Sequence, residues 1–205
     1  HHGDCSDKTG LLVTGNQDRG TMIWEENGNH SLYGSTSAKA DGLRACVSNT
    51  GNGYWFIHYW GVLYHKSHPI VGDDRIGEIK ITDESWYTPP MAPSHHYNED
   101  AVYVAGFDQL KKYVWNPNSN AVSEQVFPYN FRSASGEGLY GIATTPADPN
   151  RIYVVTRNGQ FFTSRDGGNN WTKTSYSGAF PPVSGWPYWG AAGYAIAVSS
   201  QNPDL

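Results

Sequence analysis

The stretch Ser164-Arg165-Asp166-Gly167-Gly168-Asn169-Asn170-Trp171 decides the predicted fold, and it directly follows a strand-like run over residues 152–163. The short carboxylate of Asp166 can accept hydrogen bonds from backbone amides of its own turn. The two glycines after it can adopt positive φ at no steric cost. Trp171 then returns on the next strand, where its ring can pack over the turn. The stretch therefore predicts a tight β-hairpin whose residues are used in building the turn.

The composition indicates an all-β protein. Of 205 residues, 14 % are aromatic and only 16 % are charged, with 23 Gly and 12 Pro. Charged residues are well below the usual quarter. No window keeps a 3.6-residue apolar period, and short or alternating apolar runs dominate between Gly, Asn, Asp and Pro. The length suits one domain or part of a larger one.

The charge pattern argues against two kinds of partner. The net charge is −5, and no basic cluster exceeds Lys111-Lys112, so nucleic acid is not an expected partner. No run reaches the 18 apolar residues typical of a membrane-spanning helix, so no membrane span is expected.

A four-strand unit recurs along the chain. Taking Val13, Phe56, Val104 and Val154 as equivalent, the spacings are 43, 48 and 50 residues. A turn, a second apolar run and a polar hairpin follow each of these runs, and a strand rich in Gly, Ala and Ser precedes some of them. Such a unit, with strands A to D, is typical of one blade of a β-propeller. The alternative is a β-sandwich with accidental periodicity.

The predicted blades cover residues 1–41, 42–92, 93–137 and 138–190, and a further blade starts at 191–205. The chain stops inside its A–B turn, at Gln201–Leu205. We therefore expect an incomplete ring of about four blades plus the first strand of a fifth, in a fragment of a larger protein. The remaining blades would come from the same or another chain. A proteolytic product or a partly ordered chain are the alternatives.

The Ser-x-Asp-x-Gly-x-x-Trp pattern resembles the Asp-box, or BNR repeat, of sortilin-type, xyloglucanase-like and sialidase-like β-propellers. The resemblance is clear over residues 138–205, fair over 8–30 and weak over 60–137, where blades two and three lack the pattern. It implies a secreted or cell-surface propeller. It also gives a structural role to four residues of the hairpin, Ser164, Asp166, Gly168 and Trp171.

Blade topology divides the loops between two faces. C–D hairpins and A–B turns share one face, and B–C turns and D–A connections share the other. The resemblance implies that ligands bind at the second face. Its B–C turns hold Asp18, Arg19, Tyr59, Trp60, Asp108, Arg157 and Asn158, and its D–A connections hold His95, His96, Tyr97, Glu137, Trp186, Tyr188 and Trp189.

The Gly185–Gly190 loop is the sharpest candidate for binding. Its aromatic residues, Trp186, Tyr188 and Trp189, can stack on sugar faces or mark a protein contact. Alternatively they fill the gap between two blades. The predicted function is therefore an extracellular module that binds glycan or protein through this face, with no convincing catalytic centre.

A glycoside hydrolase is the alternative function. In xyloglucanase-like enzymes a turn that resembles Thr14–Gly20 carries a catalytic aspartate, which here is Asp18. Hydrolysis needs a second carboxyl group, and Asp108 or Glu137 would have to supply it. The simpler interpretation, which we favour, is that Asp18 caps its own turn. Sialidase chemistry would need an arginine triad, and no spacing singles out three of the arginines.

Other chemistry is sparse in the sequence. Cys5 and Cys46 allow a single disulfide, which a chain of this size does not need. Sequons at Asn29 and Asn170 weakly favour a secreted or cell-surface protein. The histidine pairs, His95-His96 and His65-x-x-His68, lack further ligands, so no metal is predicted. No cofactor-binding motif occurs.

Overall fold

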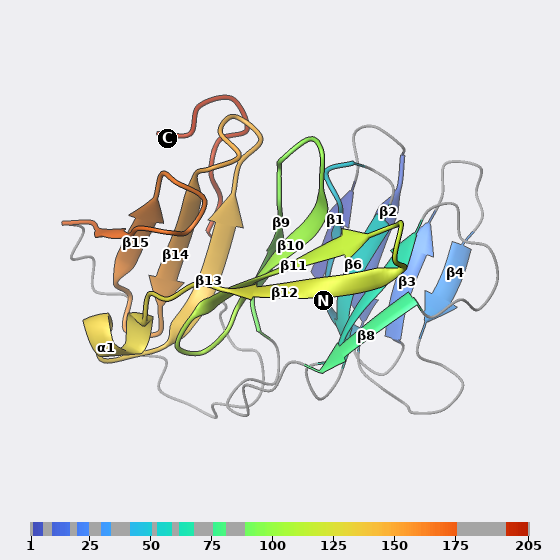
Figure 1. Cartoon of the computed structure of the whole chain (residues 1–205), viewed down its shortest axis with the longest axis horizontal. Helices are drawn as coiled ribbons and strands as arrows, with labels where there is room; N and C mark the ends of the chain where they lie inside the picture. The colour runs from blue at the N-terminus through green and yellow to red at the C-terminus, as the bar shows by residue number, and fades with distance from the viewer. Residues whose placement is uncertain are drawn as a thin grey trace.

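The computed structural model describes residues 2–5, 10–16, 20–24, 30–33, 42–50, 53–58, 62–67, 76–80, 89–175 and 196–204. Within them lie four antiparallel sheets of four strands, each with its strands paired in chain order (Figure 1). Each sheet is one blade, and its strands are A to D in chain order. The sheets do not close into a ring. The all-β prediction of four-stranded propeller blades is therefore confirmed.

The strands have the following bounds. Blade 1 holds β1 (His2–Cys5), β2 (Leu12–Asn16), β3 (Gly20–Trp24) and β4 (His30–Tyr33). Blade 2 holds β5 (Gly42–Val47), β6 (Gly53–His58), β7 (Val62–Ser67) and β8 (Ile76–Lys80). Blade 3 holds β9 (Met91–Pro93), β10 (Asp100–Ala105), β11 (Leu110–Asn116) and β12 (Ala121–Val126). Blade 4 holds β13 (Leu139–Thr144), β14 (Ile152–Thr156), β15 (Phe161–Ser164) and β16 (Thr172–Lys173).

Alternating side chains of the central B strands, β6 and β10, pack against two different blades. Val102 and Val104 of β10 lie in a core with Trp55 and Ile57 of blade 2. Tyr103, between them, lies in a second core with residues of blade 4. Because successive side chains of a strand point to opposite faces, one strand can contribute to both interfaces. A third core fills the space between blades 1 and 2, built from Leu11, Val13, Ile23, Ala45, Val47, Tyr54 and Phe56.

The strand pairing corrects the alignment of blade 1. The last residue of strand A pairs with Leu12 in blade 1, with Tyr54 in blade 2 and with Val102 in blade 3. Thr14, not Val13, is therefore equivalent to Phe56. A shift of one residue exchanges the two faces of a strand. The run Leu11–Val13 is apolar at every position, so it lacks the alternation that would have fixed the register.

Strand A of blade 3 was missed in the sequence. It is the three-residue strand β9, which begins at Met91 just before the expected boundary at 92/93. Two prolines precede it and its last residue is Pro93. Proline cannot donate a ladder hydrogen bond, so this composition argues against a strand. Here β9 pairs only with β10, at the inner edge of the sheet.

One short helix, α1 (Phe131–Ser135), interrupts the all-β pattern in the connection from blade 3 to blade 4. Asn130 caps its start by accepting a hydrogen bond from the amide of Ser133 at 2.7 Å. Gly136 ends it in the left-handed conformation at φ 84°. The buried Phe131 anchors the helix to the core. None of the described helices is long and apolar enough to cross a membrane.

Candidate binding surfaces

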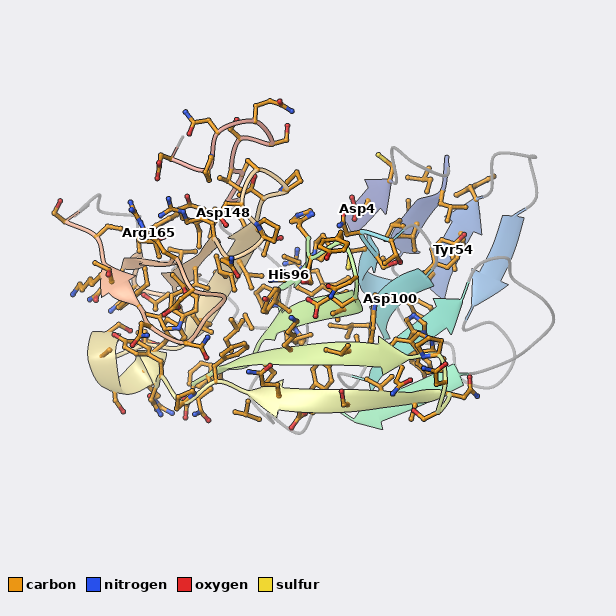
Figure 2. The ribbon with its side chains drawn as sticks, turned by 45° about the horizontal axis from the view of Figure 1, so that its top comes forward. Asp4, Tyr54, His96, Asp100, Asp148 and Arg165 are labelled. Atoms are coloured by element: carbon orange, nitrogen blue, oxygen red, sulfur yellow. The ribbon has the colours of Figure 1, made fainter. Side chains whose placement is uncertain are left out.

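The described loops fall on two faces. The A–B face carries the A–B turns and the C–D hairpins, with described residues 48–50, 94–99, 116–120, 145–151, 164–171 and 196–204. The B–C face carries residues 106–109, 127–138 and 157–160. In Figure 2, His96 lies between Asp4 and Asp148 along the A–B face.

The structure moves the segment His95–Tyr97 to the other face. The sequence placed these three residues in a D–A connection on the B–C face. Because β9 is strand A of blade 3, they lie in the turn from β9 to β10, on the A–B face. The error follows directly from the missed strand.

Tyr97, at the tip of this turn, is 86 % exposed. The turn beneath it is held from several directions. Asn49 of blade 2 donates through Nδ2 to the carbonyl of His95 at 2.9 Å. Glu99 Oε1 accepts a hydrogen bond from Ser94 Oγ at 2.5 Å, and it forms an ion pair with Lys112 Nζ at 2.5 Å. An exposed aromatic ring therefore stands on a well-fixed turn.

The hairpin 164–171 is held by its own side chains. Ser164 Oγ accepts a hydrogen bond from the amide of Gly168 at 2.9 Å. Asp166 accepts from the amide of Asn170 at 2.9 Å and from its Nδ2 at 2.7 Å. These donors hold the pKa of the Asp166 carboxyl below its ordinary value. The turn chemistry predicted from the sequence is confirmed.

The other side of this hairpin faces the core. The Trp171 indole N–H donates to the carbonyl of Gly168 at 2.9 Å, and the ring lies edge-on to Phe131 with centroids 4.9 Å apart. A Cβ on Gly168 would come within 3.0 Å of the Phe127 ring. The hairpin residues therefore make contacts with one another and with the core. Asn170, the described sequon residue, is exposed, and its amide is bonded to Asp166.

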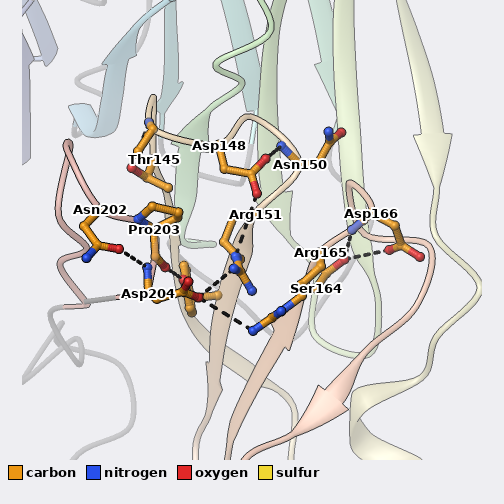
Figure 3. A network of polar contacts seen from close by, with 12 residues as sticks. Thr145, Asp148, Asn150, Arg151, Ser164, Arg165, Asp166, Asn202, Pro203 and Asp204 are labelled. Atoms are coloured by element: carbon orange, nitrogen blue, oxygen red, sulfur yellow. Dashed lines mark hydrogen bonds and ion pairs between the residues drawn. The ribbon is translucent and has the colours of Figure 1, made fainter.

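Residues 196–204 lie against blade 4 where the first strand of a fifth blade is expected. Residues 196–199 have no strand pairing within the described part of the chain. Figure 3 shows Asp204 between two arginines: Oδ1 lies 2.6 Å from an Arg151 Nη and 3.6 Å from an Arg165 Nη. Tyr153 also donates to the carbonyl of Pro203.

The turn at 199–204 repeats the A–B turn of blade 4. Thr145 Oγ1 accepts from the amide two residues later at 3.2 Å, and Ser199 Oγ does the same at 3.2 Å. Asp148 and Asn202 each accept from the amide two residues later, at 3.0 and 2.9 Å. Thr145 and Ser199 are 54 residues apart in the sequence, and so are Asp148 and Asn202. Residues 199–204 therefore have the hydrogen bonds of an A–B turn.

The B–C face holds a compact group of loops around α1. Asn158 Nδ2 donates to the carbonyl of Ser135 at 2.8 Å, and the amide of Arg157 donates to the carbonyl of Gly138 at 2.9 Å. Asp108, on the neighbouring B–C turn, accepts through its carbonyl from the amide of Phe131 at 2.8 Å. The predicted residues Asp108, Glu137 and Arg157 thus belong to one group of loops on the B–C face.

A buried polar group between blades 2 and 3 escaped the sequence analysis. Asp100 lies 2.7 Å from both His65 Nε2 and Trp55 Nε1. The imidazole also stacks on Trp115, with ring centroids 4.5 Å apart. The sequence feature that could have indicated this group is Gly53 at the start of β6, because a glycine in a strand often marks a close approach of another group. In the structure, a Cβ at Gly53 would lie 2.5 Å from His65 Nε2. Among the described residues, no group of three or more His, Cys, Asp or Glu forms a metal site.

The disulfide allowed by the sequence does not form, since Cys5 and Cys46 are both free. Ala45 and Val47 face blade 1, which holds Cys5. Cys46, between them on β5, faces the opposite way into the core shared with blade 3. Burial raises the pKa of the Cys46 thiol well above its ordinary value, and two nearby carboxylates add to the effect.

Several predicted site residues lie outside the described part of the chain. These are Asp18, Arg19, Tyr59, Trp60, the aromatic residues Trp186, Tyr188 and Trp189, and the sequon residue Asn29. Their proposed roles stay predictions.

Comparison with known proteins identifies the fold alone. No family model and no curated protein matches the chain. Among solved structures, it is similar to the β-propeller domain of Cps50 (Swd1) from Myceliophteria thermophila, with a TM-score of 0.63 and 13 % identity over 96 % of this chain and 57 % of that chain. Raptor from Chaetomium thermophilum gives 0.60 and 12 %, over 84 % and 16 %. Sqt1 from Saccharomyces cerevisiae gives 0.59 and 8 %, over 83 % and 46 %.

These three neighbours are propellers of the WD40 type. They support a β-propeller fold for this chain, and they do not support the sortilin, xyloglucanase or sialidase superfamily. The hairpin 164–171 is stabilised by hydrogen bonds between residues close in the sequence. Such a hairpin can therefore occur in a protein that does not belong to those superfamilies. The chain covers less than two thirds of each neighbour's length.

Proposed function

We propose that this propeller module binds a protein partner through its A–B face, with Tyr97 as the central contact. The observation that carries the proposal is the 86 % exposure of Tyr97 on a turn fixed to two blades. Tyrosine is enriched at protein-binding hot spots because its ring offers a large contact area and its hydroxyl a hydrogen bond.

The fixed turn favours binding for an energetic reason. A loop that is already ordered loses little conformational entropy when a partner docks. Two contacts hold the two ends of the Tyr97 turn: the hydrogen bond from Asn49 to the carbonyl of His95, and the ion pair of Glu99 with Lys112. The anchor is therefore presented in one geometry.

Charged groups further along this face can add specificity. Arg165 of the hairpin 164–171 has a side chain that is 74 % exposed, and that of Asp204 is 64 % exposed. Charges at the rim of an interface steer association and select among partners. A partner with a mixed-charge surface around an apolar pocket fits this arrangement.

The test is affinity capture from the source organism followed by measurement of Kd with the purified partner. Tyr97→Ala should weaken binding at least about thirtyfold, because truncating a hot spot costs about 2 kcal/mol or more. Val126→Ala is the matched control, because Val126 is an exposed hydrophobic residue on the outer strand β12. Equal affinities for the wild type and Tyr97→Ala would refute the role of this turn.

Glycan binding through the B–C face is the second candidate. It depends on the loop at 185–190, whose aromatic residues were singled out by the sequence. A glycan array with Trp186→Ala and Trp189→Ala as controls tests it, and unchanged binding by these variants would remove the aromatic platform.

A glycoside hydrolase remains a further prediction, with Asp18 as the catalytic carboxylate. The assay is hydrolysis of xyloglucan and of sialosides by the wild type and Asp18→Asn. Equal rates for the two would exclude the role of Asp18. A secreted or cell-surface location likewise stays a prediction, and detection of glycan at Asn29 or Asn170 in the natural protein would support it.

A further inference from the structure

One face of blade 1 is apolar and exposed. Leu12 of β2 and Trp24 of β3 are directly paired across the sheet, and they are 39 % and 38 % exposed. Met22 lies next to them on the same face, at intermediate exposure. The residues that alternate with them, Val13 and Ile23, are fully buried against blade 2. Leu12, Met22 and Trp24 therefore lie on the face of the sheet opposite to the one that packs against blade 2; this face is called the blade 1 outer face below.

The equivalent positions in the other blades are covered. The strand registers make Leu12 equivalent to Tyr54, Val102 and Ile152, each of which is 0 % exposed.

In each of the later blades, the covering surface is the preceding blade. Tyr54 packs with Leu11 and Val13 of blade 1. Val102 packs with Trp55 of blade 2, and Ile152 with Tyr103 of blade 3. The blade 1 outer face continues this series of interfaces, so a preceding blade is the surface that fits it.

The far side of blade 4 argues against a second copy as that surface. A second copy that continued the series head to tail would place its blade 1 against blade 4. There Thr145 donates to the carbonyl of Ser199 at 2.6 Å, and Arg151 holds Asp204. Residues 199–204 already occupy the place of the next A–B turn, so the incoming blade would have to displace them.

We propose that the blade 1 outer face is covered by a further four-stranded blade of the same polypeptide, which closes the propeller ring. The likeness to the Cps50 (Swd1) propeller domain supports this, because nearly the whole of this chain covers only 57 % of that chain. The inference is independent of which face binds a partner. Covering Leu12 and Trp24 would also remove an exposed apolar surface that favours association.

Thiol labelling tests the proposal. Leu12→Cys is placed in a Cys5→Ser background, both in the chain of residues 1–205 and in the complete polypeptide produced from its own gene. Val126→Cys is the control, because Val126 is 45 % exposed on the outer strand β12. We expect Leu12→Cys to react at least about tenfold more slowly in the complete polypeptide than in residues 1–205, because burial allows reaction only during local opening. Val126→Cys should react equally in both.

Two outcomes would overturn the proposal. Equal labelling of Leu12→Cys in the two proteins would show that no blade covers this face. Protection that disappears on dilution, together with a dimer mass by light scattering, would show that a second copy covers it. Met22→Cys, on the same face, provides a second reporter if Leu12→Cys does not fold.

Discussion

His65 Nε2 lies 2.7 Å from Asp100 Oδ2, and this contact joins strand C of blade 2 to strand B of blade 3. Both side chains are almost entirely removed from water, and Asp100 also accepts the indole N–H of Trp55 at 2.7 Å. One carboxylate therefore satisfies two buried ring nitrogens of the neighbouring blade.

Asp100→Ala should destabilise the protein strongly. It leaves the buried nitrogens of His65 and Trp55 without their acceptor, and an unsatisfied buried polar group costs about 1–3 kcal/mol. The free energy of unfolding in urea measures the loss. Gln125→Ala, at an exposed position of the outer strand β12, is the control and should change stability by less than about 0.5 kcal/mol. Equal stabilities of the two variants would contradict a structural role for Asp100.

Gly53→Ala should disrupt the same contact by steric overlap. A Cβ at Gly53 would overlap Asp100 Oδ2 and lie 2.5 Å from His65 Nε2. Overpacking of this kind costs about 1–3 kcal/mol. Gly136→Ala is the matched control, because its site has open space but φ is 84°. If crowding dominates, Gly53→Ala should lower the melting temperature more than Gly136→Ala does.

Asp166 should make stability depend on acidic pH. The amide and side chain of Asn170 lower its pKa in the folded protein below the ordinary 3.8. A depressed folded-state pKa contributes stability above pH 3.8, which is lost as the pH falls through the folded-state value. NMR titration of the Asp166 carboxyl checks the shift directly. In Asn170→Ala the pKa should return toward 3.8; an unchanged value would rule out Asn170 as the cause.

Tyr103 should make stability depend on alkaline pH. Burial, with a smaller contribution from the charge of Glu99, raises its pKa from 10.0 to about 12. Between these values the unfolded chain ionises at this residue and the folded chain does not, so stability is fully present below pH 10.0 and falls as the pH rises toward 12. Unfolding measured against pH should show a smaller alkaline decrease in Tyr103→Phe. An identical decrease in the variant would assign it to other groups.

Arg151→Ala should release residues 199–204 from blade 4. The buried Arg151 side chain holds Asp204 at 2.6 Å, so its loss should speed amide exchange throughout this turn. Arg165→Ala is the control, because its exposed ion pair at 3.6 Å is worth no more than about 1 kcal/mol. Hydrogen exchange read by mass spectrometry separates the two, and equal effects would mean that Arg151 is not the anchor.

The features that the sequence predicted correctly are local. The turn at 164–171 follows from Asp166 and its glycines, and the repeated B strands follow from short apolar runs bounded by turn residues. The features that it misplaced lacked a local signal. Because prolines argue against a strand, β9 was not predicted, and Tyr97 was therefore assigned to the wrong face. An unbroken apolar run shifted the register of blade 1 by one residue.

The sequence by itself thus determined the hairpins, the four-stranded unit and its repetition, because backbone conformation and side-chain alternation act over a few residues. Only the tertiary structure decided which face each side chain occupies. The contact of His65 with Asp100 spans 35 residues, and Leu12 is exposed while its equivalents are buried. Both depend on how separate blades pack against each other, and the pattern within one blade does not specify that packing.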